Sequence, residues 1–293
     1  MKILWVTTFR SFGISKKNDL VQKKFLKNLK NLNTKITLSV TIFNEKNIKH
    51  NVKTKGINTV FFKNKKKLLH NSKYSQSICM QNAIKLLDNS FNFIIWSTAD
   101  ISIPKNFIKK IQSQKERNIL MTAFPMYYIN SKKEMDSFSS NWGLDLFILK
   151  LESPKKLTKL KKFINDCPNY GWGCYEHFFS SISDGLNIKY INISKNLIIK
   201  KFNNDRDAFN DLREHEINSW KINQKYLIKY LKKNNLSKFF ATGSMYYLIF
   251  KFFNLKEIDL RLFIIYIKIL INFPFKFINF VIKTIMMYFY ILG

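Results

Sequence analysis

The chain has 293 residues and a mass of 35.0 kDa, and 46% of its residues are hydrophobic, so it can bury the core of one large or two small domains and is not a disordered tail. Its 50 lysines and arginines exceed its 19 aspartates and glutamates by 31, which favours polyanionic partners electrostatically. The abundance of lysine, asparagine, isoleucine and phenylalanine also fits the codon bias of an AT-rich genome, so charge alone does not indicate nucleic-acid binding. The three cysteines form no CxxC pair, which predicts neither a disulfide framework nor a zinc cluster and favours a reduced, intracellular protein.

Strand and helix patterns alternate along most of the chain. In chain order, the hydrophobic pattern first predicts a strand at 2–9, a helix at 18–32, strands at 36–43 and 60–62, a helix at 75–87 and a strand at 93–96. It then predicts a helix from residue 106, strands at 119–124 and 144–149, a helix at 155–165, a turn and helix at 171–183, and strands at 190–193 and 197–199. The polar residues 130–141 are expected to form a mobile loop. This alternation predicts an α/β fold: a mostly parallel sheet, flanked by helices, that binds ligands beyond the carboxyl ends of its strands.

The C-terminal part has a different character, and we predict a helical segment at 221–293 after a globular domain at 1–220. Residues 262–293 are almost entirely apolar. Their few polar residues share with Arg261 an arc of about 80° on a helical wheel. These residues are Lys268, Asn272, Lys276, Asn279 and Lys283.

We expect the amphipathic residues 260–293 to lie on an anionic membrane surface, in two helices divided at Pro274. The lysines would contact headgroups, while the apolar side chains would enter the acyl boundary. A spanning helix is disfavoured because each central lysine is penalised by roughly 2.5 to 3.5 kcal/mol. The alternative is a helical hairpin that packs on the globular domain or on a second subunit of an oligomer.

The most informative residues follow the predicted strand at 93–96, which leads through Ser97, Thr98 and Ala99 to Asp100. A carboxylate at the end of a buried strand suits a divalent cation, Mn²⁺ or Mg²⁺, that neutralises a nucleotide diphosphate. The alternative is that Asp100 caps a helix that begins near Pro104. With 8 glycines and no glycine-rich phosphate loop, the chain favours a metal-bridged diphosphate.

These residues resemble the metal-binding segment of A-type (GT-A) glycosyltransferases, where a hydrophobic strand ends in an Asp-X-Asp triplet. Here Thr98 occupies the first acidic position, which leaves Asp100 as the one carboxylate of the motif. Residues 142–150 resemble the family strand that lines the donor sugar and acceptor pocket. Residues 169–178 are similar to the glycine and tryptophan turn whose acidic residue lies beside the acceptor hydroxyl.

The resemblance implies roles for three residues further along the chain. Glu176 would be the general base that takes the acceptor proton in an inverting transfer. Its alternative role is to stabilise a helix N-terminus. Asp145 would orient the donor sugar or the acceptor. His215 would complete the metal site with Asp100, although the charged residues around it also fit a solvated helix.

Further residues would bind the nucleotide-sugar donor if the resemblance holds. Thr7, Thr8 and Arg10 come at and after the end of the first strand, where the family holds the base and phosphates. Glu45 follows the second long strand, and Asn82 lies in a predicted helix near the donor. Arg10 could equally be a surface charge, Thr7 a plain strand residue and Asn82 part of a polar helix face.

The sequence therefore predicts a metal-dependent, hexosyltransferase-like enzyme, active at 1–220 and peripheral on the cytoplasmic face of the cell membrane through 260–293. It would transfer a sugar from a nucleotide-sugar donor to a glycan or lipid-linked acceptor during cell-surface glycan biosynthesis. One alternative is an inactive glycosyltransferase-like scaffold, which Thr98 makes plausible. The other is a basic protein that binds nucleic acid or another polyanion, but the lysines are scattered, and we expect no specific nucleic-acid partner.

Overall fold

The computed structural model describes most of the chain up to residue 201 and four residues beyond it. The described residues are 1–9, 16–43, 56–64, 75–123, 125–127, 146–167, 178–179, 182–183, 185–193, 197, 199–201, 229–230 and 233–234.

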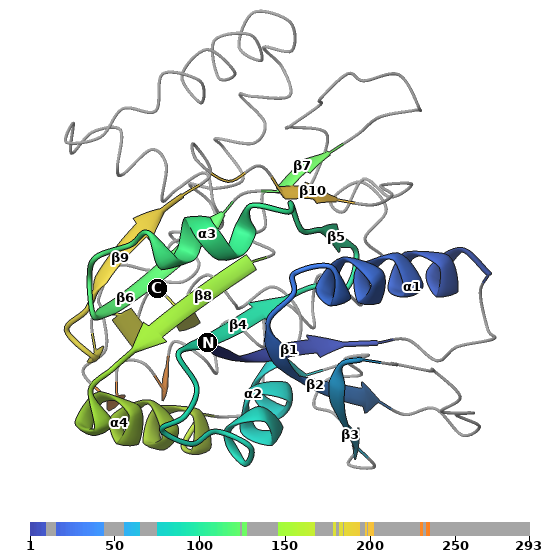
Figure 1. Ribbon diagram of the computed structural model, residues 1–293. Coiled ribbons are helices and arrows are strands. Elements are labelled where there is room, and N and C mark those ends of the chain that lie inside the picture. Colours follow the sequence, from blue (N-terminus) through green and yellow to red (C-terminus); the bar gives the residue numbers. More distant parts are fainter. Residues whose placement is uncertain are drawn as a thin grey trace, which may run out of the picture.

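A seven-stranded sheet forms the centre of the molecule, in the order β3-β2-β1-β4-β8-β6-β9 (Figure 1). Its strands are β1 (Lys2–Thr8), β2 (Lys35–Phe43), β3 (Asn58–Asn64), β4 (Phe93–Ser97), β6 (Asn118–Ala123), β8 (Leu146–Leu151) and β9 (Lys189–Asn192). The strands β1 to β4 pair in parallel, and so do β6 and β9, whereas β8 is antiparallel to both of its neighbours. The predicted mostly parallel sheet is confirmed, with β8 as its exception.

Helices cover both faces of this sheet (Figure 1). They are α1 (Lys16–Lys30), α2 (Gln76–Ile84), α3 (Phe107–Gln112) and α4 (Pro154–Asn165). Successive side chains of a strand point to opposite faces, so Ile3 and Trp5 of β1 enter the core under α1 and α3. Leu4 and Val6 enter the core under α2 and α4. This burial on both faces explains why β1 is a continuous apolar run and does not alternate.

Serine side chains start the two helices on one face. The Ser75 hydroxyl accepts a hydrogen bond from the backbone N–H of Ile78 at the start of α2 (3.3 Å), and Ser153 accepts one from Lys156 at the start of α4 (3.4 Å). Pro154 follows Ser153 in the first turn, where a missing N–H does no harm. Local sequence signals therefore fix both helix starts.

A second, three-stranded sheet lies apart from the first, in the order β5-β10-β7 (Figure 1). Its strands are β5 (Ile101–Ser102), β7 (Pro125–Tyr127) and β10 (Ile199–Lys201). The strand predicted at 197–199 corresponds to β10 and so belongs to this smaller sheet. No strand was expected at β5 or β7, because two or three residues are too few to show a periodic pattern.

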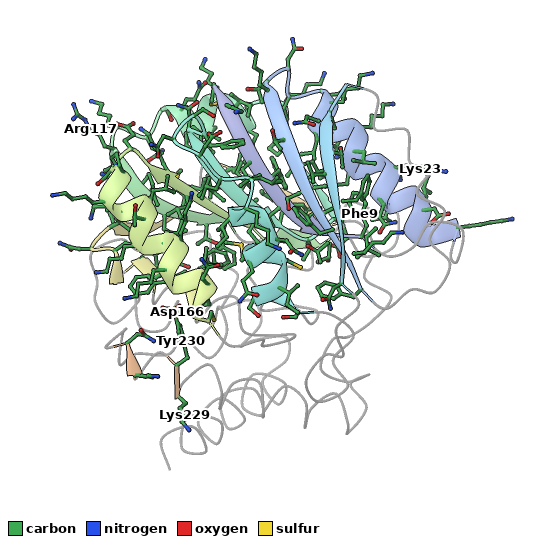
Figure 2. All side chains as sticks on the ribbon, turned by 90° about the horizontal axis from the view of Figure 1, so that it is seen from below. Phe9, Lys23, Arg117, Asp166, Lys229 and Tyr230 are labelled. Carbon is green, nitrogen blue, oxygen red and sulfur yellow. The ribbon has the colours of Figure 1, made fainter. Side chains whose placement is uncertain are left out.

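A residue from the predicted C-terminal segment packs against α4. The Tyr230 hydroxyl donates a hydrogen bond to the Phe163 carbonyl over 2.6 Å, and the Tyr230 side chain is buried in the core under α2 and α4. Figure 2 shows Tyr230 beside Asp166, at the end of α4. Among the described residues no helix is both long and apolar enough to cross a bilayer. The amphipathic residues 260–293 lie outside the described residues, so their membrane role stays a prediction.

Candidate functional site

The carboxyl ends of β1, β2 and β4 meet at one edge of the sheet because these strands run parallel. Thr7 and Thr8 end β1, and Thr8 pairs in register with Thr41 near the end of β2. Thr98 and Asp100 directly follow β4. The structure thus brings together at this edge the predicted site residues that end β1 and follow β4.

The turn after β4 carries the predicted carboxylate. Residues 99 and 100 form the turn between β4 and β5, and Asp100 is half-buried there. The Thr98 hydroxyl oxygen is buried and has no hydrogen-bond partner among the described residues. A buried hydroxyl that is left unpaired in a native fold calls for an explanation, and a ligand at this edge would supply one.

Asp100 does not cap the next helix. The helix α3 begins at Phe107, one residue after the predicted start at residue 106 and not near Pro104, where the capping alternative placed it. Its N-cap is Asn106, which makes no side-chain capping bond, and the backbone N–H of Phe107 donates to the carbonyl of Pro104 over 3.0 Å. The alternative role for Asp100 is therefore wrong, because β5 separates Asp100 from the helix.

Asn82 reaches the same edge from α2. Its amide nitrogen donates to the Thr41 hydroxyl over 3.2 Å, and its amide oxygen accepts a hydrogen bond from the Lys85 ammonium group over 3.2 Å. Since Thr41 pairs with Thr8, this contact places Asn82 near the end of β1. Asn82 therefore does more than make one face of α2 polar, which was the alternative that the sequence left open, because it bonds to a strand of the sheet.

The hydroxyl of Thr7 is used inside the sheet. It donates to the Ser97 carbonyl over 2.8 Å, and the Thr7 side chain has no exposed surface. The Trp5 indole N–H donates to the Ser97 hydroxyl over 2.8 Å. The sequence predicted no role for either Trp5 or Ser97. A tryptophan in a buried strand is a signal that could have been used, because its indole N–H needs a partner.

The described residues fit a divalent cation only in part. They contain no group of three or more His, Cys, Asp or Glu side chains that could hold a metal. Asp100 supplies one carboxylate, and Thr98 supplies a hydroxyl that has no hydrogen-bond partner among the described residues. Magnesium is commonly held by one or two carboxylates together with substrate phosphates, so this donor set suits a cation that arrives with a diphosphate.

Thiol chemistry has no support in the described part of the chain. Burial raises the pKa of the Cys79 thiol far above its ordinary value, and burial also raises that of Cys167. Because the thiolate is the nucleophile, a buried thiol with a raised pKa is inert. The polar residues at the carboxyl edge are therefore the better candidates for chemistry.

Other predicted site residues lie outside the described residues and stay predictions: Arg10, Glu45, Asp145, Glu176 and His215. Two described residues close to them in sequence contact β4 or β8. Leu146, which follows Asp145, pairs with Ser97 of β4. Phe179, three residues after Glu176, stacks on Phe147 of β8 with the ring centroids 4.3 Å apart.

No family model and no curated protein matches the sequence. Solved structures are similar to it. The crystal structure of S. aureus TarS 1–349 in complex with UDP-GlcNAc is 10% identical, with a TM-score of 0.55 and coverage of 81% of this chain and 68% of that chain. A second crystal structure of S. aureus TarS 1–349 is 9% identical, with a TM-score of 0.50 and coverage of 81% and 67%. At this level of identity the similarity establishes the fold.

Proposed function

Given that the chain has the A-type glycosyltransferase fold that its sequence predicts, we propose that it is a glycosyltransferase. It moves a sugar from a nucleotide-sugar donor to a glycan or lipid-linked acceptor. The observation that carries this proposal is the carboxyl edge of the sheet, where Thr8, Asn82, Thr98 and Asp100 come from adjacent elements. The similar fold of TarS, crystallised with UDP-GlcNAc, supports a nucleotide sugar as the donor class.

In this proposal the turn after β4 receives the donor diphosphate. Asp100 and the Thr98 hydroxyl would hold Mn²⁺ or Mg²⁺, with His215 as a further ligand. When bound, the cation would neutralise the charge that develops on the leaving diphosphate. Thr8 and Asn82 contact the donor from β1 and α2. Hydrogen bonds that are already formed, as between Asn82 and Thr41, keep such a site in position before the ligand arrives.

The acceptor side is assigned to residues outside the described part. In an inverting transfer, Glu176 takes the acceptor hydroxyl proton while the anomeric carbon gains the acceptor oxygen and loses the diphosphate. Asp145 orients the donor sugar or the acceptor. The pairing of Leu146 with Ser97 and the packing of Phe179 on β8 support these assignments.

Arg10 and Glu45 are proposed to contact the phosphates and the base of the donor. Described residues close to them in sequence are buried at the same edge: Phe9, which precedes Arg10, follows β1, and Phe43, two residues before Glu45, ends β2.

A protein that binds polyanions without catalysis is the weaker alternative. Figure 2 shows nitrogen-tipped side chains that project from several sides of the described domain, Lys23 and Arg117 among them. Nucleic-acid binding favours basic residues gathered on one face. A dispersed distribution therefore supports solubility more than a nucleic-acid groove.

The decisive experiment is thermal shift of the full chain with UDP, GDP, ADP and CDP and their sugar conjugates, each with and without Mn²⁺. A ligand that prefers the native state raises the apparent melting temperature. We expect a manganese-dependent shift with one nucleotide, and its loss in Asp100→Asn. Asp88→Asn is the matched control, because Asp88 precedes β4 at the opposite edge of the sheet. No shift for the wild-type protein with any of these ligands would favour the inactive scaffold.

We also propose that residues 260–293 hold the enzyme on the inner face of the cell membrane, where a lipid-linked acceptor would be found. A variant that lacks residues 260–293 keeps Tyr230 and its bond to Phe163. We expect the full chain, but not this variant, to sediment with vesicles that contain phosphatidylglycerol, and neither to sediment with phosphatidylcholine vesicles. Continued sedimentation of the variant would contradict the proposal, and dissociation of an oligomer would support the packed hairpin.

A further inference from the structure

Two side chains of β1 hold the last residue of β4. The Trp5 indole N–H donates to the Ser97 hydroxyl over 2.8 Å, and the Thr7 hydroxyl donates to the Ser97 carbonyl over 2.8 Å. All three side chains are buried, with exposed fractions of 1% or less. Ser97 is thus held through both its side chain and its backbone.

These side-chain bonds take over where the backbone ladder stops. The pairing between β1 and β4 runs from Ile3 with Phe93 to Val6 with Trp96. Ser97 lies one residue beyond the last pair and continues only its pairing with Leu146 of β8. On the β1 side, the Ser97 carbonyl accepts a hydrogen bond from the Thr7 hydroxyl, in place of the backbone pairing that holds earlier residues of β4.

The Trp5 ring has a fixed direction. It packs between Phe25 of α1 and Phe107 of α3, at centroid distances of 6.0 and 5.6 Å. A large ring enclosed in this way has few alternative rotamers, so the direction of its N–H is set by the core. The position of Ser97 is therefore coupled to the packing of two helices.

The segment 98–100, which consists of Thr98 and the turn at 99 and 100, is held at its other end as well. Ile101 is fully buried and pairs with Lys201 in the small sheet. The next residue, Ser102, accepts a hydrogen bond from the Asn28 amide of α1 over 3.4 Å. Residues 98–100 therefore bridge two anchored points, and loosening one of these points gives the segment freedom that it lacks in the intact protein.

We propose that Thr7 and Trp5 are positioning residues for the segment 98–100, which they fix through Ser97. This inference rests on the proposed function, in which that segment presents Thr98 and Asp100 to the donor diphosphate and its cation. It gives Thr7 an indirect role in place of a direct donor contact. Outer partners that orient metal ligands commonly change affinity by about 10- to 100-fold when they are removed, although they touch neither metal nor substrate.

The test compares three substitutions in the full chain. Thr7→Val keeps the shape and removes the hydroxyl, whereas Thr7→Ser restores the hydroxyl. Tyr230→Phe is the matched control, because it removes another buried bond from a hydroxyl to a carbonyl, the one to Phe163, away from β4. Two readouts are needed: hydrogen exchange of the amides of residues 98–101, and the affinity for UDP, GDP, ADP or CDP in the presence of Mn²⁺.

We expect Thr7→Val to speed exchange at 98–101 and to weaken nucleotide binding by about tenfold or more. Thr7→Ser should behave like the wild type, and Tyr230→Phe should change neither readout. Unchanged exchange or unchanged affinity in Thr7→Val would overturn the positioning role. Equal loss in Thr7→Ser and Thr7→Val would also overturn it, because the methyl group and not the hydroxyl would then matter. If the wild-type protein binds none of the four nucleotides, the donor site itself is wrong, and the inference built on it is rejected too.

Discussion

The polar side chains before β4, at the amino edge of the sheet, differ in their hydrogen bonding from those after β4, at the carboxyl edge. At the amino edge, the Asn92 amide oxygen accepts a hydrogen bond from the backbone N–H of Lys2 over 2.8 Å. The Ser90 hydroxyl accepts one from the Lys2 ammonium group over 2.7 Å. Ser90 also donates to Asp88. At the carboxyl edge, the Thr98 hydroxyl is buried and has no partner among the described residues.

In this contrast the unpaired Thr98 hydroxyl supports the proposed site at the carboxyl edge, whereas the hollow lies at the other edge. A cavity of about 420 Å³ opens at the amino edge, between Lys2, Asn33, Lys35, Ser90 and Asn92. Lys2 already donates hydrogen bonds to both Asn92 and Ser90 beside it. Polar groups that bond to one another need no ligand to account for them, whereas a buried hydroxyl without a partner calls for an explanation.

The largest expected effect tests how the core supports the carboxyl edge. Trp5→Ala should lower the free energy of unfolding by about 3 to 5 kcal/mol, since it leaves a cavity between α1 and α3 and unpairs the Ser97 hydroxyl. Urea unfolding followed by circular dichroism measures this change. A loss below about 1 kcal/mol would mean that the sheet end does not depend on the packing of Trp5.

The next effect compares the carboxylates before and after β4, Asp88 and Asp100. In the proposed function, Asp100→Asn should slow release of the nucleoside diphosphate from a nucleotide sugar by at least about 100-fold, because stabilisation of developing charge is lost. Asp88→Asn should stay within about twofold of the wild type, since Asp88 lies at the amino edge. Equal rates for the two variants would remove the functional difference between the edges.

A smaller effect has opposite signs at the two edges. Thr98→Val removes a buried hydroxyl that has no described partner, so without ligand it should leave stability unchanged or raise it by up to about 1 kcal/mol. Ser90→Ala removes bonds to Lys2 and Asp88 and should lower stability by about 0.5 kcal/mol or more. Melting temperatures in parallel scans would show the signs. If Thr98→Val is the more destabilising change, its hydroxyl is already satisfied.

The smallest effect is a pH dependence at the amino edge. The hydrogen bond from the Ser90 hydroxyl holds the pKa of the Asp88 carboxyl below its ordinary value. A carboxyl whose pKa is lowered in the folded state adds stability above its unfolded pKa of about 3.9, and this stability is lost as the pH falls through the folded pKa. Carbon NMR of Asp88 should give a lower midpoint in the wild type than in Ser90→Ala. Identical midpoints would show that Ser90 does not act on this carboxyl.

The long elements of the fold were predictable because their patterns are local. The strands β1, β2 and β4 and the helix α4 appear within a few residues of their expected positions, since apolar runs and a Ser-Pro start are written in adjacent residues. The turn that places Asp100 after β4 was predictable for the same reason.

What the sequence did not reveal depends on contacts between distant residues. The bond from Trp5 to Ser97 joins residues 92 positions apart, and no local pattern encodes it. The sequence suggested a contact between Thr7 and the nucleotide-sugar donor, whereas the Thr7 hydroxyl bonds to the Ser97 carbonyl inside the sheet. This bond was not predictable either, because it depends on where the pairing between β1 and β4 ends. The antiparallel direction of β8 depends on how the chain returns to the sheet, which the hydrophobic pattern of β8 does not contain.

The hydrogen bond from Tyr230 to Phe163 has a practical consequence for anyone who shortens this protein. A chain that stops at residue 220 would leave the Phe163 carbonyl without its donor and would uncover part of the core under α2 and α4. Such a fragment should be digested by trypsin sooner than one that stops after residue 234. For crystallisation, the later end point is the better choice, because it keeps the buried Tyr230 side chain together with the core that it packs against.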